Sequence, residues 1–118
     1  MAKTLPEPTE IFTAHHYFAD MGARKVRPFA RLIVGKNVEE ALELLRYYPN
    51  RGARLLEKVL RSAIGNAVHE GVSRPYTLDV LEARVDDGPM WKRVHPRARG
   101  MAYLVRRRLC HIHVTIGR

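Results

Sequence analysis

The stretch MWKRVHPRARGMAYLVRRRLCHIHVTI, residues 90–116 of this 118-residue chain, decides its fold. Strand-forming residues stand on both sides of residues 95–100, where proline and glycine suit the end of a hairpin. At its C-terminal end, Ile112, Val114 and Ile116 share one face and are expected to join a sheet. Residues 90–109 have no matching apolar segment to cover them, so we expect two strands that project about 35–40 Å. Such a ribbon is marginally stable alone in water, so it needs a partner.

The same stretch carries most of the excess positive charge. The chain has 21 Lys and Arg against 12 Asp and Glu, a formal net charge of +9. From Arg84 to Arg118 nine basic side chains face only two acidic ones, Asp86 and Asp87, and no acid follows. This segment is too apolar for a disordered tail. It is therefore expected to be structured against a polyanion, with nucleic acid the first candidate and an anionic membrane surface the second.

Composition alone disfavours several classes of protein. No apolar run approaches the ~18 residues of a membrane span. Residues 1–10 contain two prolines and two glutamates and do not resemble a signal peptide, and the absence of Arg from residues 1–20 disfavours a mitochondrial transit peptide. A lone cysteine, Cys110, cannot form an internal disulfide. This cysteine usage fits a reducing cytosol, so we expect a cytoplasmic protein. Because nucleic acid is the first candidate for the polyanion, we expect no membrane partner.

Ahead of the hairpin, apolar periodicity predicts one strand and three helices. The helix beginning near Asn37 has a capping box, in which Asn37 accepts from first-turn amides and Glu40 reaches back. Pro28 lies inside the first helical pattern, so that helix is expected to kink or to start late. After a loose lead at residues 1–9, the expected elements are a strand at residues 10–20 and helices at residues 23–34, 38–48 and 51–70.

A second strand is expected at residues 76–85. Its apolar phase slips partway along, which predicts a β-bulge near Leu81 and Glu82. The sequence Asp86-Asp87-Gly88-Pro89 then predicts a bend before the hairpin, so the two carboxylates are read as turn residues rather than as an acid/base pair.

These elements predict an α+β fold with three helices packed on a small antiparallel three-stranded sheet and a long protruding basic β-hairpin. All of residues 1–118 are expected to form a single domain. Its globular body would comprise about residues 10–88 and 110–116, and the extended hairpin about residues 89–109.

Basic side chains form two groups. The alternation of a strand would bring arginines out on both faces of the hairpin, where their planar donors suit phosphate and base contacts. On the third helix, spacings of 3, 4 and 3 align a second group on one stripe, for which a merely solvated face is equally plausible. The hairpin group is Lys92, Arg93, Arg97, Arg99, Arg106, Arg107 and Arg108, and the stripe is Arg51, Arg54, Lys58 and Arg61.

Histidines offer little support for a metal site or for catalysis. His111 and His113 would share a strand face while Cys110 points the other way, and no third ligand is evident. Packing or phosphate contact is the expected role of these imidazoles. No nucleophile and base pair and no glycine-rich phosphate loop is found. We therefore expect no catalytic residue, no metal and no cofactor.

Three groups of motifs, in order along residues 22–115, resemble one known family. RKVR (24–27) and GKNVEEA (35–41) are similar to its opening helices, and EKVLRSAI (57–64) to its third helix. VDDGP (85–89), Lys92-Arg93, PRARG (96–100) and His111-Ile112 are similar to its hairpin. The chain thus resembles the bacterial large-subunit ribosomal protein L twenty-two family.

The resemblance implies a non-catalytic rRNA-binding protein of the large subunit. The body would lie near the polypeptide exit, and the hairpin would pass through rRNA to line the nascent-peptide tunnel and support subunit assembly. Other large-subunit proteins and the nascent peptide would be further partners. The resemblance places Lys92, Arg93, His95, Arg97 and Arg99 at the tunnel end, Arg106, Arg107 and Arg108 as a clamp in rRNA, and Arg24, Lys25, Arg27 and His111 as further rRNA contacts.

Two alternatives remain open on the residues alone. Three helices followed by a basic hairpin is also the element order of a winged-helix DNA-binding protein, although the third helix has no polar cluster suited to reading base edges. A small RNA-processing enzyme is the other, although an acid/base constellation is missing.

Overall fold

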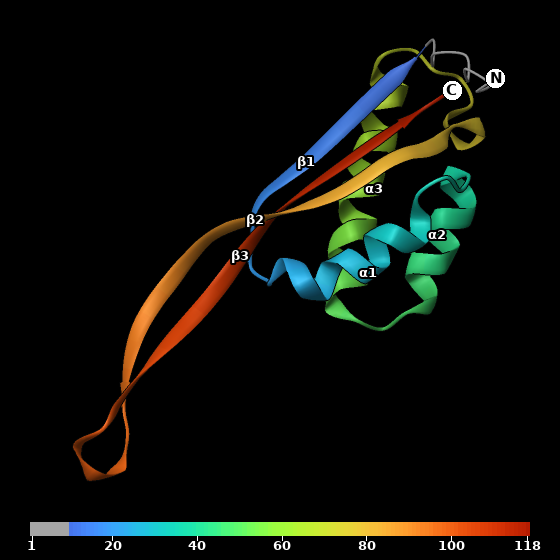
Figure 1. Ribbon diagram of the computed structural model, residues 1–118. Coiled ribbons are helices and arrows are strands. Elements are labelled where there is room, and N and C mark those ends of the chain that lie inside the picture. The colour runs from blue at the N-terminus through green and yellow to red at the C-terminus, as the bar shows by residue number, and fades with distance from the viewer. Residues whose placement is uncertain (1–9) are drawn as a thin grey trace, which may run out of the picture.

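The computed structural model describes residues 10–118, which contain three strands and three helices (Figure 1). The expected α+β fold is confirmed. The loose lead expected at residues 1–9 lies outside the described residues. The elements are β1 Ile11–Ala19, α1 Ala23–Ile33, α2 Val38–Tyr47, α3 Arg51–His69, β2 Asp79–Pro96 and β3 Ala102–Gly117, with short 3-10 turns at Pro75–Thr77 and Ala98–Gly100.

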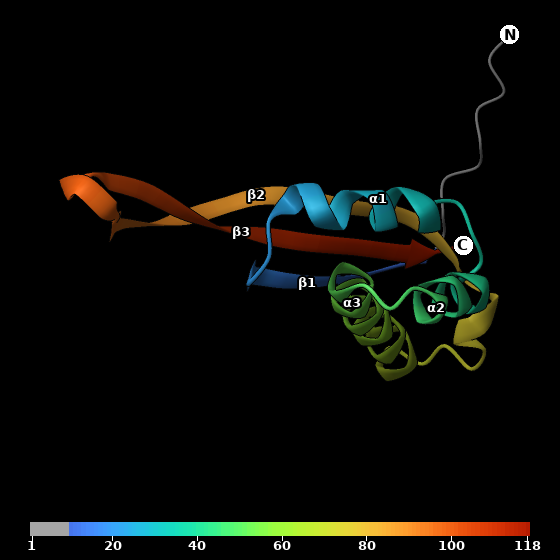
Figure 2. The same cartoon turned by 90° about the horizontal axis from the view of Figure 1, so that it is seen from below.

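The sheet is antiparallel with β3 in its centre, between β1 and β2. The helices lie on one of its faces, with α1 against β2 and α3 against β1, as Figures 1 and 2 show. Alternation along β3 decides which side chains meet them: Ile112, Val114 and Ile116 are fully buried beneath the helices. His111 and His113 therefore belong to the opposite face, which none of the three helices in residues 10–118 covers.

The predicted apolar faces of the helices form the core. Val26, Ala30 and Ile33 of α1 are buried, as are the apolar side chains that recur every three or four residues along α2 and α3. Val34, which follows α1, is 45% exposed because it is the extended C-cap residue of that helix. Phe18 of β1 is also exposed, since a bulge gives it a φ of 58° and places Ala19 in the next buried position instead.

Helix ends differ from prediction in two places. α1 begins at Ala23 and runs through Pro28, so a late start is wrong. The side chain of Asn37 caps α2 by accepting from the Glu39 amide at 3.0 Å, but Glu40 does not complete the box. Its carboxylate lies 3.9 Å from the Lys36 ammonium instead, one helical turn back. α3 ends at His69, one residue before the predicted end, and Gly71 follows with a φ of 96°, a left-handed conformation that suits the end of a helix.

β2 starts later than predicted and then continues further. Residues 76–78 do not pair with the sheet, because Pro75–Thr77 turns as a 3-10 helix. The predicted bulge is confirmed, since Val80 pairs with Ile116 and Glu82 with Thr115, which leaves Leu81 as the extra residue.

The bend predicted at residues 86–89 is wrong. β2 passes through this segment, and Gly88 and Pro89 together oppose Leu109 in a second bulge. Proline suits this position because a bulge residue need not donate to the ladder. Glycine suits position 88 because a Cβ there would lie 3.1 Å from the Leu109 backbone. Asp86 and Asp87 are thus strand residues rather than turn residues.

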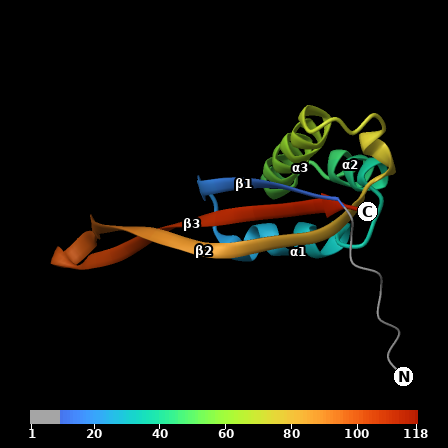
Figure 3. The same cartoon turned by 90° about the horizontal axis from the view of Figure 1, so that it is seen from above.

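Beyond this bulge, β2 and β3 leave the body as a two-stranded ribbon, here called the arm (residues 90–108; Figures 1 and 3). Every arm residue is exposed, whereas Leu109 and Cys110 are buried. The molecule is correspondingly long, with extents of 63 × 34 × 25 Å. At the tip the Arg97 amide donates to the Met101 carbonyl at 2.7 Å, and the chain reverses through left-handed Arg99 and Gly100.

Candidate nucleic-acid interface

Basic side chains occupy both sides of the arm. Directly paired residues share a face, so Lys92 and Arg106 emerge together on one side, while Trp91 and Arg107 emerge together on the other. Counted along β3 from the buried Ile112, Arg106 and Arg108 belong to the helix side of the sheet. Like charges placed opposite each other repel, so the bare arm favours the approach of anions.

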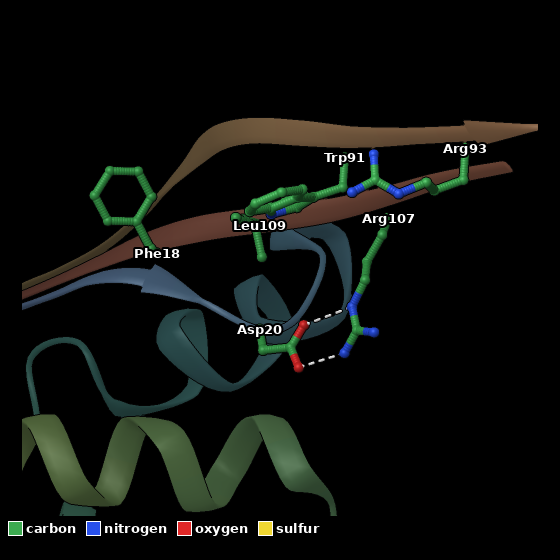
Figure 4. A pocket seen from close by; sticks show the side chains of 6 residues that line it. All are labelled: Phe18, Asp20, Trp91, Arg93, Arg107 and Leu109. Carbon is green, nitrogen blue, oxygen red and sulfur yellow. Dashed lines mark hydrogen bonds and ion pairs between the residues drawn. The ribbon is translucent and has the colours of Figure 1, made fainter.

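A bidentate ion pair fixes the base of the arm to the body. The Arg107 guanidinium donates to both oxygens of Asp20, from Nε at 2.9 Å and from Nη2 at 2.5 Å, as Figure 4 shows. Arg51 of α3 lies 3.7 Å from the same carboxylate. The hydrogen bond from Arg107 lowers the pKa of Asp20 below its usual value, and the same bond raises the pKa of Arg107.

Next to this pair, three separate elements bring cations around one hollow of about 490 Å³, here called the basic hollow. α1 contributes Lys25, α3 contributes Arg51, and the arm contributes Arg106 and Arg108. Arg107 also reaches its wall, but Asp20 partly compensates its charge. These predicted site residues, distant in sequence, thus converge where the arm meets the helices.

The remaining predicted residues of α1 lie on the neighbouring side of the arm base. Arg24, Arg27 and Arg108 line a smaller depression with Asp87. Arg27 also holds the sheet, because its Nε donates to the Val85 carbonyl at 3.1 Å and its guanidinium lies 3.7 Å from Asp87. Arg24 is the more exposed and has no ion-pair partner among residues 10–118.

The residues of the predicted stripe on α3 have different surroundings. Glu57, a buried carboxylate, accepts from Arg54 at 2.9 Å and from Arg61 at 2.7 Å, and Arg46 of α2 lies 3.5 Å away. Arg54 also donates to the Leu45 and Tyr48 carbonyls at the end of α2. Arg54 and Arg61 therefore stabilise the helix packing. Arg51 instead joins the basic hollow, and Lys58 lines a shallow depression beside His15 and His16.

The outer face of the sheet carries a group of histidines whose proximity was not predicted from the sequence. Strand pairing sets His15 opposite His113, with their Nδ1 atoms 2.6 Å apart, and His113 Nε2 lies 3.3 Å from Asp86. His111 Nδ1 accepts from the Phe18 amide at 3.0 Å. Burial is the largest cause that lowers the pKa of His113, and the nearby Arg84 and His15 side chains lower it further.

Neither metal nor thiol chemistry is indicated in the described part of the chain. Residues 10–118 contain no group of three His, Cys, Asp or Glu side chains that could hold a metal ion. Cys110 is fully buried under the helices, and that burial raises the pKa of its thiol. Within the same residues, no helix is long and apolar enough to cross a membrane.

His95, Arg97 and Arg99 lie where β2 ends and β3 begins, at the far end of the arm (Figure 1). They are away from the basic hollow and from the depression lined by Arg24 and Arg27, which both lie at the base of the arm. A further hollow at the base has an apolar floor that the sequence did not reveal. Phe18, Trp91 and Leu109 line it together with Asp20, Arg93 and Arg107 (Figure 4). The pairing of Trp91 with Arg107 would have predicted this hollow, but that register depends on the bulge at residues 88–89.

Comparisons with known proteins agree with the resemblance. Residues 14–117 match a family model described as ribosomal protein L22p/L17e. The large ribosomal subunit protein uL22 of Rhodopirellula baltica is 47% identical over 110 residues, which cover 89% of this chain and 92% of that protein. The uL22 of Caldicellulosiruptor saccharolyticus is 42% identical over 118 residues, covering 98% and 97%. That of Pseudothermotoga lettingae is 44% identical over 99 residues, covering 84% and 71%.

Proposed function

Because the chain belongs to the ribosomal protein L22p/L17e family, we propose that it binds large-subunit rRNA through the arm and the basic hollow beside it. The family is one of structural ribosomal proteins rather than of enzymes. Its membership favours the ribosomal assignment over the winged-helix and RNA-processing alternatives. The protein accordingly sits on the cytoplasmic ribosome, as a component of the large subunit.

The observation that carries this proposal is that every residue of the arm is exposed. Seven Lys and Arg side chains and no acidic one lie on residues 90–108, and none of these residues is buried. Apolar side chains such as Val94, Tyr103 and Leu104 are left in water there as well. Surrounding rRNA would supply both phosphates for the guanidiniums and base or sugar surface for the apolar side chains.

The two ends of the site have different roles in the proposal. At the base, Lys25, Arg51, Arg106 and Arg108 hold phosphates where arm and body meet. At the tip, His95, Arg97 and Arg99 line the nascent-peptide tunnel, while the body lies near the polypeptide exit. The family resemblance and the length of the arm support this placement. By contacting rRNA along its whole length, the arm would also support subunit assembly, next to other large-subunit proteins.

Binding of the purified full chain to a large-subunit rRNA transcript tests the proposal. The dissociation constant is measured by filter retention from 50 to 400 mM salt, with a duplex DNA of similar length as the competitor. We expect retention of the rRNA and an affinity that falls steeply with salt, because phosphate contacts release counterions. Sequence-specific retention of the DNA at physiological salt, with no preference for rRNA, would contradict the proposal. Recovery of the chain in stoichiometric amount with salt-washed large subunits supports the assignment in the cell.

A further inference from the structure

The apolar hollow at the base of the arm, here called the Trp91 hollow, has a volume of about 550 Å³. This volume is within the range of small-ligand sites. Figure 4 shows the Phe18 ring at one end of it and the Arg93 side chain at the other, with Leu109 in the floor and the Asp20–Arg107 pair alongside. One end is therefore aromatic and the other cationic.

Trp91 and two guanidiniums are held on the same side of the arm. Trp91 pairs with Arg107 across the strands, and Arg93 follows two residues later on the same face. The Arg93 guanidinium carbon lies 5.4 Å from the centre of the indole ring, a cation–π distance. Arg107 is fixed by both oxygens of Asp20. Trp91 is nevertheless 54% exposed, so its ring remains available to a partner.

The other aromatic wall depends on an uncommon backbone conformation. Phe18 has a φ of 58°, a value rarely adopted by bulky residues, and such outliers concentrate at functional sites. The bulge keeps the Phe18 ring out of the core and exposed beside the hollow. His111 stabilises this conformation of Phe18 through two contacts. Its Nδ1 accepts a hydrogen bond from the Phe18 amide, and its ring lies 5.0 Å from the Phe18 ring, edge to face.

We propose that the Trp91 hollow takes up one unpaired nucleotide of the rRNA, with its base stacked on Trp91 and its phosphate bound by Arg93. This inference rests on the proposed function and names a specific ligand within it. Aromatic rings stack on any unpaired base, and a neighbouring guanidinium suits the attached phosphate. A base paired in a helix does not offer its face in this way, so the hollow selects single-stranded or bulged RNA.

Charge favours a nucleotide over an apolar peptide as the occupant. Two guanidiniums and one carboxylate line the hollow, and the carboxylate already accepts two hydrogen bonds from Arg107. Arm residues 90–108 around it contribute cations and no acid. The site therefore has a net positive charge beside an aromatic surface, which matches the chemistry of a nucleotide.

Trp91 is the only tryptophan in the chain, so its fluorescence reports on this hollow alone. The full chain is titrated with a single-stranded RNA dodecamer of mixed sequence, with the same RNA annealed into a duplex, and with the large-subunit rRNA transcript. We expect quenching by the single strand and by the transcript, and little change with the duplex. Collisional quenching by acrylamide should also fall when either of the first two is bound.

Three variants separate stacking from general affinity. Trp91→Leu removes the aromatic face and should weaken binding of the single strand about tenfold, the scale of one lost stack. Trp91→Phe keeps an aromatic ring and should stay within about threefold of the original affinity, which also controls for folding. Tyr76→Leu is the matched control and should leave the affinity unchanged, because Tyr76 is equally exposed, at 53%, but lies in the Pro75–Thr77 turn, outside the arm and the hollow.

The outcomes distinguish this inference from the proposed function. If the transcript binds with salt-dependent affinity while Trp91 emission and its acrylamide quenching stay unchanged, the hollow does not take a nucleotide and rRNA binding stands. Protection of Trp91 only after other large-subunit proteins are added would assign the hollow to a protein and overturn the inference. Failure of the transcript to bind at all would overturn both the proposed rRNA binding and the nucleotide site in the Trp91 hollow.

Discussion

Arg107 donates two hydrogen bonds to Asp20 and thereby ties the base of the arm to the segment that joins β1 to α1. The two residues are 87 positions apart in the sequence. In the free protein, the middle residue of the Arg106–Arg108 run is therefore already engaged, whereas its two neighbours face the basic hollow. This asymmetry makes the three consecutive arginines inequivalent.

Replacing Asp20 by Asn should loosen the base of the arm. The neutral amide cannot form the bidentate ion pair, so backbone NMR order parameters of residues 104–108 should fall towards those of the tip. Asp79→Asn, at the far end of β2, is the control and should leave them unchanged. In the original protein the link should survive acidification below the usual carboxylate range, because Arg107 lowers the pKa of Asp20. Order parameters at residues 104–108 that are identical in both variants would contradict the prediction.

Single alanine substitutions in the arginine run should affect rRNA binding unequally. Arg106→Ala and Arg108→Ala should each weaken binding to the rRNA transcript and reduce the slope of log K against log salt by about 1, as expected for one lost phosphate contact. Arg107→Ala should reduce the slope less, because Asp20 partly compensates that guanidinium. The measurement is filter retention at several salt concentrations. Equal slopes for all three variants would show that Asp20 releases Arg107 on binding.

Replacing Glu57 by Gln should destabilise the packing of α2 against α3. The buried carboxylate accepts charge-assisted hydrogen bonds from Arg54 and Arg61, and a neutral amide would leave their guanidiniums poorly compensated. The arginines are half-exposed, so solvent screening limits the loss in the free energy of unfolding to about 1–3 kcal/mol. Urea denaturation measures it, with exposed Glu43→Gln as the control. A change below about 0.5 kcal/mol, the scatter of ordinary surface substitutions, would be inconsistent with this role.

Stability should decrease on mild acidification because of His113. The folded protein lowers the pKa of His113 below 6.5, so the unfolded chain takes up its proton first as the pH falls. The contribution is complete above about pH 6.5 and is lost as the pH falls through the folded value. His15, His111, Arg84 and Asp86 face the same imidazole.

Urea denaturation between pH 7.5 and 5 tests this, and His113→Gln should give a flatter pH profile than the original protein. His69→Gln, at the exposed end of α3, is the control and should retain the original profile. A His113→Gln profile as steep as the original would assign the dependence to another group.

Local patterns predicted most of this fold. The helical stripes and the reversal at the hairpin tip depend on residues within a few positions of each other, so they are visible in the sequence. The ion pairs of Arg54 and Arg61 with Glu57 were predictable too, because spacings of three and four bring side chains together on one face of a helix.

The features that the sequence did not reveal depend on distant partners. The φ of Phe18 and the bulge at Gly88 and Pro89 arise from the register of β1 and β2 with β3, which no local pattern encodes. The Asp20–Arg107 pair is non-local in the same way. The candidate interface was therefore predictable as a set of basic residues but not as two distinct hollows.

The two-for-one bulge opposite Leu109 has a consequence for how the arm can vary in length. Side chains alternate sides along a strand, so a single residue added to β2 reverses the side of every residue further out on that strand. Trp91 would then exchange sides with Lys92, and the indole would turn towards the helices. Insertions that keep Trp91 and Arg107 on one side and Lys92 and Arg106 on the other must therefore come in pairs, which restricts evolution of the arm to even steps.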